Sequence, residues 1–565
     1  MQTLISSPVF RGLLALWFVV FGTFQSHAQG SFGSHTKRFT RQDSLRGTLS
    51  TLRSCYDVTF YDLDLKVNFT NKSITGSNTI HYQAVTDFTT LQVDLFDNLD
   101  ITSITQHNKS LSFEREGKAV FITFPQKQQK GQYYQLKIEY GGHPLVARMP
   151  PWDGGFTWKK DKAGKDWLGV SCQHLGASAW WPNKDHPTEE PDSMRIAVAA
   201  PTELTCVANG NLRSAKDLGN GYTRFEWFVG YPINNYSVSL NVADYAHWSD
   251  TYTATDGEKL DLDYYVLKEN LEKARPHFEQ VKPMLRCFEE WFGKYPFWKD
   301  GYALVETPYL GMEHQSAVAY GNKYMNGYLG QDLSQTGVGH KWDYIIIHES
   351  GHEWFGNSLT AHDYAELWIQ EGFTTYSEIV YSECQQGFEA ACKYAEGLQK
   401  NIANREALIG PLGVNIDPSG DIYPKGANLL HTLRNVVAND ELWKKTLRGF
   451  TEYFKCKVLN TNQVIDYFCK ETGMNLNPIF RQYLYHAQPP VFEYQLSTSG
   501  ILQYRLLTDE QGIKLPLKVG YGPENYVTIH PSDQWQSLQL TPVVGKVFRV
   551  ATELFYVIPK QVTLN

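Results

Sequence analysis

Positive charge is in short supply along this sequence. Its 52 Lys and Arg residues are outnumbered by 60 Asp and Glu residues, which gives a formal net charge of -8 at pH 7. A nucleic-acid-binding surface needs clustered Lys and Arg side chains to neutralise phosphates, and no basic patch stands out along the chain. The composition therefore argues against a nucleic-acid partner.

Cysteine is scarce too, with 8 residues in 565 and none in a CxxC or zinc-ribbon spacing. This absence excludes a thiolate zinc site or a dithiol redox motif as the basis of function. Disulfides are possible if the chain is exported, but their pairing cannot be determined from sequence. Cys384 and Cys392 are the closest pair along the chain.

Long apolar runs are missing after the first thirty residues. Arg11 precedes the apolar run 13–24, and Ser26 and Ala28 are the small residues that a signal peptidase recognises. The run is shorter than the roughly 20 residues of a membrane-spanning helix. We predict a signal peptide over 1–28 that is cleaved after Ala28, with an uncleaved anchor as the alternative. The mature protein would be periplasmic or secreted, without stable membrane insertion.

What is present is enough apolar material for more than one core, since 42% of the residues are hydrophobic and 14% aromatic. Alternating apolar residues predict strands in the first half, and helical periodicity dominates later. The sequence predicts a multidomain α+β protein with a polar leader over 29–54, either disordered or an edge extension. An all-β domain follows over 55–247, a mixed but mostly helical domain over 248–488, and a small β-sandwich over 489–565.

One motif is typical of metal chemistry. His348, Glu349 and His352 form HExxH, and Glu371 lies nineteen positions after the second histidine. Histidines four residues apart project from one face of a helix, so both can bind one ion, and Glu371 can be the third ligand if the first helix ends near Gly356. A bare HExxH also occurs on ordinary solvated helices, but the apolar residues before it and the spaced glutamate after it favour a metal site.

Two histidines and one carboxylate suit Zn²⁺, with the fourth position open for water. Bound zinc lowers the pKa of its water to about 7 and polarises a carbonyl group. Glu349 is then the expected general base, which takes the water proton and passes it to the leaving amine. We predict one zinc ion per chain.

The segments HESGHEWFGN and LWIQEGF, with the order of the three domains, resemble the gluzincin zinc aminopeptidases of peptidase family M1, the aminopeptidase N and leukotriene hydrolase family. The resemblance covers roughly residues 50–490. It implies a saddle-like N-terminal β domain and a thermolysin-like catalytic domain. Because 489–565 leaves no room for the long helical C-terminal domain of many members, we expect the short bacterial type.

The resemblance extends to a substrate-binding strand. Gly311, Met312 and Glu313 are similar to the GxMEN strand of the family, whose glutamate binds the free α-amino group of the substrate. His314 departs from this pattern, which has Asn at that position. The alternative role for Glu313 is that of an ordinary strand-end residue in a surface salt bridge.

Three further residues follow from the resemblance or from helix spacing. Gln173 matches a second amine contact, although it could be only a polar turn residue, and Tyr423 matches the donor to the oxyanion of the tetrahedral intermediate. Glu378 lies two turns beyond Glu371 and could orient a zinc-bound histidine, or be solvated. The segment 149–156 is similar to bacterial members, with no chemistry assigned.

The leading hypothesis is an exported zinc aminopeptidase that acts on peptides with a free N-terminus. A zinc endopeptidase shares HExxH and the distant glutamate but needs no amine anchor. A noncatalytic peptide-binding or adhesion protein is the alternative from another class. The sequence leaves open the preferred first residue, the oligomeric state, and the choice between periplasm and extracellular space.

Overall fold

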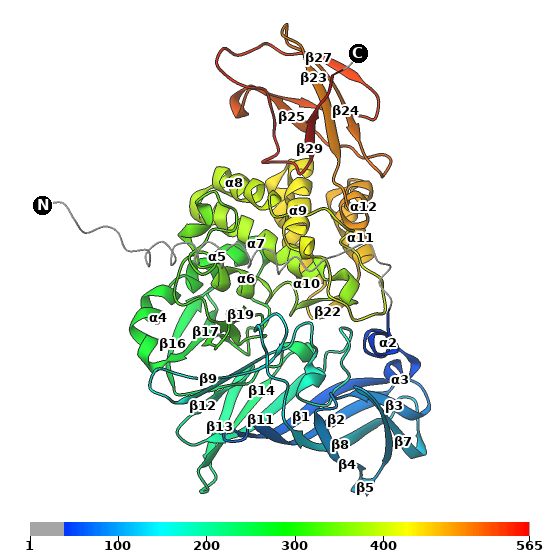
Figure 1. Ribbon diagram of the computed structural model, residues 1–565, viewed down its shortest axis with the longest axis vertical. Helices are drawn as coiled ribbons and strands as arrows, with labels where there is room; N and C mark the ends of the chain where they lie inside the picture. The colour runs from blue at the N-terminus through cyan, green and yellow to red at the C-terminus, as the bar shows by residue number, and fades with distance from the viewer. Residues whose placement is uncertain (1–38, 564–565) are drawn as a thin grey trace, which may run out of the picture. The chain divides into compact units, whose positions relative to one another are not determined.

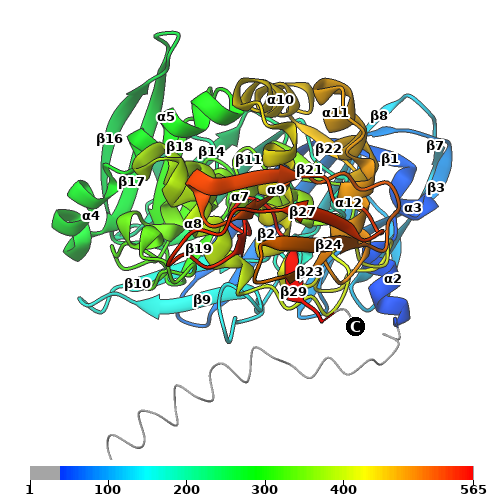
Figure 2. The same ribbon diagram turned by 90° about the horizontal axis from the view of Figure 1, so that it is seen from above.

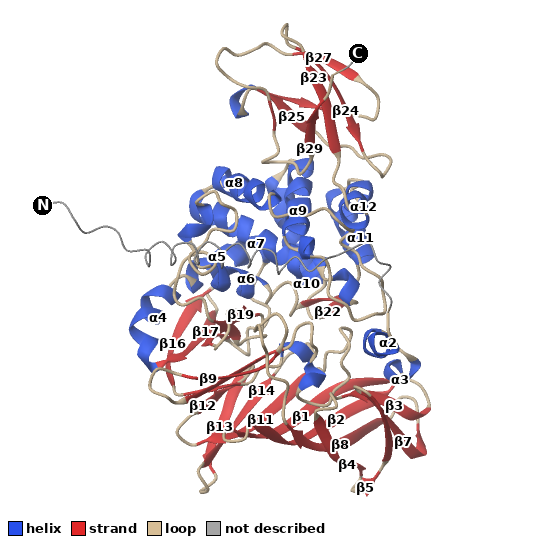
Figure 3. Cartoon of the chain, viewed as in Figure 1, coloured by secondary structure: helices blue, strands red, loops and turns tan. Residues whose placement is uncertain are grey.

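The computed structural model describes residues 39–563, so the predicted signal peptide and the start of the leader lie outside the described residues. Strands dominate the N-terminal part of the described chain, helices the middle, and strands again the C-terminal part (Figures 1 and 3). This confirms the predicted α+β class and the order of its parts. No helix among these residues is long and apolar enough to cross a membrane.

The N-terminal region is built on one large sheet and two smaller ones. Within residues 39–563 the large sheet has eight strands, in the order β13 (Asn211–Asp217), β14 (Tyr222–Val229), β11 (Ser193–Pro201), β1 (Tyr56–Asn68), β2 (Ser73–Ala84), β8 (Tyr133–Gly142), β4 (Leu99–Gln106) and β5 (Lys109–Ser110). One smaller sheet contains, in order, β3 (Phe88–Asp94), β7 (Ala119–Gln128) and β6 (Ser112–Glu116). The other contains β12 (Thr205–Val207), β15 (Asn241–Ala243), β10 (Asp166–Ser171) and β9 (Gly155–Lys160).

Strand β1 explains how the sequence pattern produces this region. Leu63, Leu65 and Val67 are buried while the residues between them are partly or fully exposed, because successive side chains of a strand point to opposite faces. The strand pairs antiparallel with β2 and parallel with β11. Its apolar face joins one core that extends over the three N-terminal sheets.

The prediction for the leader over 29–54 needs a correction, because part of this segment is ordered and helical. Residues 41–54 form α2 (Arg41–Gly47) and α3 (Thr51–Ser54), and the Arg53 side chain is fully buried. Its guanidinium pairs with Asp94 on β3 at 2.5 Å. The sequence left open a disordered leader or an edge extension, and neither describes this helical segment, because Asp94, the partner of Arg53, lies 41 residues away in the sequence.

The middle region starts with a five-stranded sheet within the described residues, in the order β16 (Tyr245–Thr253), β17 (Lys259–Leu267), β18 (Tyr302–Glu306), β20 (Val318–Tyr320) and β19 (Gly311–Met312). The predicted domain boundary at residue 247 falls inside β16. One face of the sheet, including Tyr264 and Leu304, packs on the helices, and the other, including Tyr265 and Val305, joins the N-terminal core. The sheet thus connects the two regions.

Helices complete the middle region. They are α4 (Leu271–Phe278), α5 (Val281–Phe292), α6 (Tyr344–Gly351), α7 (Trp368–Gln386), α8 (Phe388–Gln399), α9 (Pro424–Val437), α10 (Asp440–Tyr453), α11 (Thr461–Thr472) and α12 (Asn477–Tyr485), with the short strands β21 (Leu359–Ala361) and β22 (Lys457–Leu459). A disulfide between Cys287 on α5 and Cys384 near the end of α7 links two of the helices, whereas Cys392 is free.

The C-terminal strands form two sheets, seen from above in Figure 2. One contains β27 (Gln536–Gln539), β24 (Ile501–Leu507), β23 (Val491–Leu496) and β29 (Ile558–Gln561), and the other β26 (Tyr526–Ile529), β25 (Leu517–Gly520) and β28 (Arg549–Val550). Their apolar side chains share one core with the helices. Helix α9 also contacts this region through His431, whose ring bonds to the carbonyl oxygen of Glu553 at 3.0 Å.

Candidate active site

Helix α6 carries the first half of the HExxH motif. Its N-cap is Asp343, whose carboxylate accepts hydrogen bonds from the backbone N–H groups of Ile345 and Ile346. His348 and Glu349 lie in the last turns, and His352 is the C-cap residue. Residues 345–351 are buried, which agrees with the run of isoleucines near the start of the helix.

The predicted helix end near Gly356 is wrong, because α6 ends at Gly351. The backbone continues in wider turns, in which Asn357 N bonds to His352 O at 3.0 Å and Ser358 N to Glu353 O at 3.2 Å. His352 still has right-handed helical dihedral angles, φ -63° and ψ -21°. Both histidines therefore remain on one face although the regular helix stops between them.

Glu371 lies in the first turn of α7, and Tyr423 immediately precedes α9. These two helices pack with their backbones in close contact: a Cβ atom on Gly426 would lie 2.8 Å from the Cα atom of Gly372. Glycine is required at the contact because any side chain there would separate the helices. The close approach brings Glu371 and Tyr423 to the same cavity.

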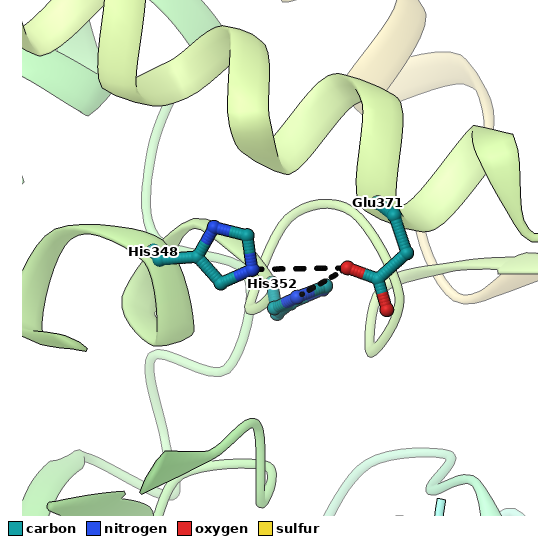
Figure 4. A group of neighbouring side chains, drawn as sticks. All are labelled: His348, His352 and Glu371. Carbon is teal, nitrogen blue, oxygen red and sulfur yellow. Dashed lines mark ion pairs between the residues drawn. The ribbon is translucent and has the colours of Figure 1, made fainter. Parts of the chain in front are cut away.

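His348, His352 and Glu371 converge, as Figure 4 shows. Nε2 of His348 is 3.7 Å and Nε2 of His352 is 3.2 Å from Oε2 of Glu371. The other ring nitrogens are engaged, since Nδ1 of His348 bonds to Glu378 at 2.7 Å and Nδ1 of His352 to the carbonyl oxygen of Phe355 at 2.9 Å. This leaves two Nε2 atoms and a buried carboxylate oxygen facing one point.

The chemistry of this donor set fits a zinc ion. Oε2 of Glu371 is buried without a hydrogen-bond partner, and both histidines are held in the orientation that presents Nε2. Two imidazoles and one carboxylate are the ligands of a typical catalytic zinc site. Glu378 also receives a hydrogen bond from Tyr394 at 2.6 Å, so the contact expected between Glu378 and a ligand histidine is present and is itself supported.

Negative charge is concentrated around this point. Burial raises the pKa of Glu349 to about 7, and the nearby His348 offsets only part of this rise. Burial lowers the pKa of His352, but the carboxylates of Glu371 and Glu313 outweigh it and raise the pKa to about 9. The buried carboxylates therefore favour a cation at the histidine nitrogens.

Glu313 and Gln173 come together beside this cluster, although they lie in different regions of the chain. The Gln173 side-chain N–H group donates to Glu313 Oε1 at 2.6 Å and to Glu371 Oε1 at 2.9 Å. Glu313 is buried, which raises its pKa, and its backbone oxygen accepts from Asn357 Nδ2 at 2.8 Å. A buried carboxylate is thus fixed next to the metal-binding residues.

The strand that carries Glu313 is closely packed on α6. A Cβ atom on Gly311 would lie 2.8 Å from Glu349 Oε1, so only glycine leaves that carboxylate its place. Met312 is buried and lines the cavity. His314, the departure from the family pattern, is fully buried, has no hydrogen-bond partner for its ring among the described residues, and has its pKa lowered by burial to about 3. It is a neutral packing residue.

These groups line one cavity of about 160 Å³ that opens to solvent. Its wall also includes Pro151 and Trp152, from the segment to which the sequence assigned no chemistry. The Trp152 side chain is 61% exposed, and Asp153 holds its loop by accepting from the backbone N–H groups of Arg148 and Met149. An exposed tryptophan next to two glycines was the available signal for this part of the cavity.

Comparison with known proteins agrees with the geometry. Residues 277–483 match the profile of the peptidase family M1 domain, and residues 58–236 match the peptidase M1 N-terminal domain. The chain belongs to peptidase family M1. It is a metallopeptidase of this family, and the fold of the two matched regions is the M1 fold.

Named relatives of this M1 peptidase include leucine aminopeptidase 2 of Lodderomyces elongisporus, 25% identical over 79% of this chain and 72% of the relative. Leukotriene A-4 hydrolase of Xenopus laevis is 24% identical over 72% of this chain and 67% of the relative. An M1 zinc metallopeptidase from Deinococcus radiodurans has a similar fold, with a TM-score of 0.63 and 20% identity over 77% of this chain and 95% of that one.

Proposed function

We propose that this M1 peptidase is an exported zinc aminopeptidase that binds one zinc ion and removes the N-terminal residue from peptides. The observation that carries the proposal is the buried carboxylate of Glu313, which lies beside the metal-binding residues and is joined to Glu371 through Gln173. A charged ammonium group bound there is held at a fixed distance from the metal, so cleavage follows the first residue. The name of one relative, leucine aminopeptidase 2 of Lodderomyces elongisporus, supports the same activity.

His348, His352 and Glu371 would hold the zinc ion, which when bound would polarise the scissile carbonyl group and lower the pKa of water. The remaining steps belong to side chains of this chain. Glu349 takes a proton from the attacking water and transfers it to the leaving amine, for which a pKa of about 7 is well suited. Tyr423 lines the same cavity, and its hydroxyl group donates to the oxyanion.

Two acceptors recognise the substrate amine. Glu313 accepts hydrogen bonds from the ammonium group, and its negative charge compensates the positive charge. Because the side-chain N–H group of Gln173 already donates to Glu313 and Glu371, its Oε1 is the atom available for the ammonium group. A substrate with an acetylated N-terminus has neither the charge nor the donors for this site.

Export is supported by the disulfide between Cys287 and Cys384, because such bonds persist in oxidising compartments and are rare in a reducing cytosol. The predicted signal peptide over 1–28 agrees with this location.

The test compares fluorogenic aminoacyl amides with their N-acetylated counterparts, with and without a zinc chelator. We expect cleavage of free-amine substrates only, and its loss with chelator. Glu313→Gln should lower kcat/KM for free amines by about 10²-fold or more, because a buried charged hydrogen bond is lost. Cleavage of acetylated substrates at similar rates would favour an endopeptidase, and no cleavage by zinc-loaded protein would favour a binding protein.

Glu306→Gln is the matched control for this substitution. Glu306 is a buried carboxylate in the same five-stranded sheet, and it accepts from the backbone of Leu267 and from the side chain of Asn270, both at 2.7 Å. It does not line the cavity. The Glu306→Gln variant therefore tests the structural effect of removing a buried charge without changing the amine site.

A further inference from the structure

The segment 42–55, which contains most of α2 and all of α3, contacts both the N-terminal region and the catalytic region. It is fixed first to the N-terminal region. Arg53 pairs with Asp94 at 2.5 Å and donates to the carbonyl oxygen of Arg46 at 2.7 Å, and Asp94 also accepts from the backbone N–H group of Asp185 at 3.1 Å. Buried charges thus hold this end of the segment in one place.

The same segment is fixed to the catalytic region. Thr48 donates to the carbonyl oxygen of Gly413 at 2.8 Å, and a Cβ atom on Gly47 would lie only 2.4 Å from the backbone N atom of Asn415. Gly413 in turn donates to Asp363 at 2.8 Å, and Asp363 caps the short turn before α7. The segment therefore lies fixed between the two regions that supply the active site.

Between these attachments Arg46 reaches the turn that carries Gln173. The turn is closed by a hydrogen bond from Gly176 N to Cys172 O at 2.7 Å, and Arg46 Nη2 donates to the carbonyl oxygen of Leu175. Gly176 has φ of 88°, and a Cβ atom there would lie 3.0 Å from Arg46 Nη2. The guanidinium group thus supports the turn that carries Gln173 at Leu175 and Gly176.

We propose that Arg46 is a positioning residue for the substrate amine site. By holding Leu175 it fixes the turn over residues 172–176, so that one Gln173 amide group reaches both Glu313 and Glu371 and presents its oxygen to the ammonium group. This inference rests on the proposed aminopeptidase function. It also places residues 42–55, which follow the predicted export signal, within the functional enzyme.

The test is a double-mutant cycle on the zinc-loaded enzyme with a free-amine aminoacyl amide. Arg46→Ala should raise KM about 10-fold, the usual effect of losing a hydrogen bond to a charged donor, and leave kcat nearly unchanged. Gln173→Ala should raise KM similarly. Because Arg46 acts through Gln173, adding Arg46→Ala to Gln173→Ala should change KM further by less than about twofold.

Arg115→Ala is the matched control. Arg115 is also half-buried and also donates to backbone carbonyl groups, those of Leu95, Phe96 and Leu99, away from the cavity. It should lower thermal stability about as much as Arg46→Ala without raising KM. Arg46→Lys keeps a donor at the turn, so it should restore part of the affinity, and it replaces Arg46→Ala if that variant does not fold.

The role of Arg46 would be overturned by an unchanged KM for both Arg46 variants, or by KM effects of Arg46 and Gln173 that multiply in the double variant. An equal rise in KM for Arg115→Ala would also overturn it, because general loosening of the fold would then explain the effect. If Gln173→Ala and Glu313→Gln both leave KM unchanged, the proposed function fails instead. The two failures are therefore distinguishable.

Discussion

The two sides of the active site are built in different ways. The metal-binding side comes from one short stretch of chain, in which His348, His352 and Glu371 lie on or beside two consecutive helices of one core. The proposed amine-binding side combines Gln173 from an N-terminal turn with Glu313, which directly follows the short strand β19. In this arrangement the proposed chemistry depends on local helix geometry, whereas the proposed substrate recognition depends on how distant segments are held together.

The comparison predicts that substitutions on the metal-binding side change turnover or metal affinity rather than KM. Glu349→Gln tests this with the largest expected effect, a fall in kcat of about 10²–10⁴-fold from the loss of the general base. Zinc content, measured by mass spectrometry, should remain at one ion per chain, whereas His352→Ala should lose the zinc as well. Full activity of Glu349→Gln would contradict the assignment.

Tyr423→Phe should have the next largest effect. Loss of one donor to the oxyanion is expected to lower kcat by about 10²–10³-fold with little change in KM, because the donor acts only in the transition state. Steady-state kinetics on a free-amine substrate measures both constants. Tyr328→Phe removes a hydroxyl group from another tyrosine of the same cavity and serves as the control. Equal effects of the two substitutions would remove Tyr423 from the mechanism.

Glu190 lies where the N-terminal region meets the catalytic region, because its carboxylate accepts a hydrogen bond from Thr360 of the catalytic region. Burial raises the pKa of Glu190 from 4.5 to about 7, and nearby Glu189 adds to the effect. The folded state therefore binds this proton more tightly than the unfolded state does. The stabilisation is complete below pH 4.5 and is lost as the pH rises to 7, which amounts to about 3 kcal/mol.

Glu190→Gln should remove this part of the pH dependence. Urea unfolding at pH 5, 6, 7 and 8 should show that the variant gains stability relative to the wild type as the pH rises. Glu389→Gln, at an exposed residue paired with Lys393, is the control and should follow the wild type. Parallel curves for Glu190→Gln and the wild type would show that this carboxylate does not couple the two regions to pH.

The smallest effect is expected for Glu378→Gln, which weakens the support of a metal ligand without removing it. Such partners of ligand histidines typically contribute 10–100-fold to metal affinity or activity. Chelator competition should therefore show weaker zinc binding by about that factor, with activity recovered at saturating zinc. Tyr394→Phe, which removes the bond from Tyr394 to Glu378, should act in the same direction to a smaller extent.

The same contrast explains what could be predicted from sequence. HExxH and Glu371 were recognisable because helix geometry fixes the spacing of side chains that meet. Gln173 and Tyr423 required resemblance to a family, because nothing local distinguishes them from other glutamine and tyrosine residues.

Errors arose where long-range contacts decide the structure. The polar segment 41–54 gave no sign of order, because Arg53 on α3 is stabilised by Asp94, which lies on the distant strand β3. The disulfide pairing had been left open, and the partner of Cys384 proves to be 97 residues away in the sequence. The end of α6 was misplaced because the turns after Gly351 keep the side-chain direction without regular helical hydrogen bonds.

The contact between Gly372 and Gly426 has a consequence for how this enzyme can diverge. Glu371 directly precedes Gly372 and Tyr423 lies three residues before Gly426, so the spacing between the proposed metal ligand and the proposed oxyanion donor is set by the absence of two methyl groups. A single alanine at either position would move both functional groups at once. Loops around the cavity can therefore vary and alter substrate choice, whereas the distance between α7 and α9 has to stay the same.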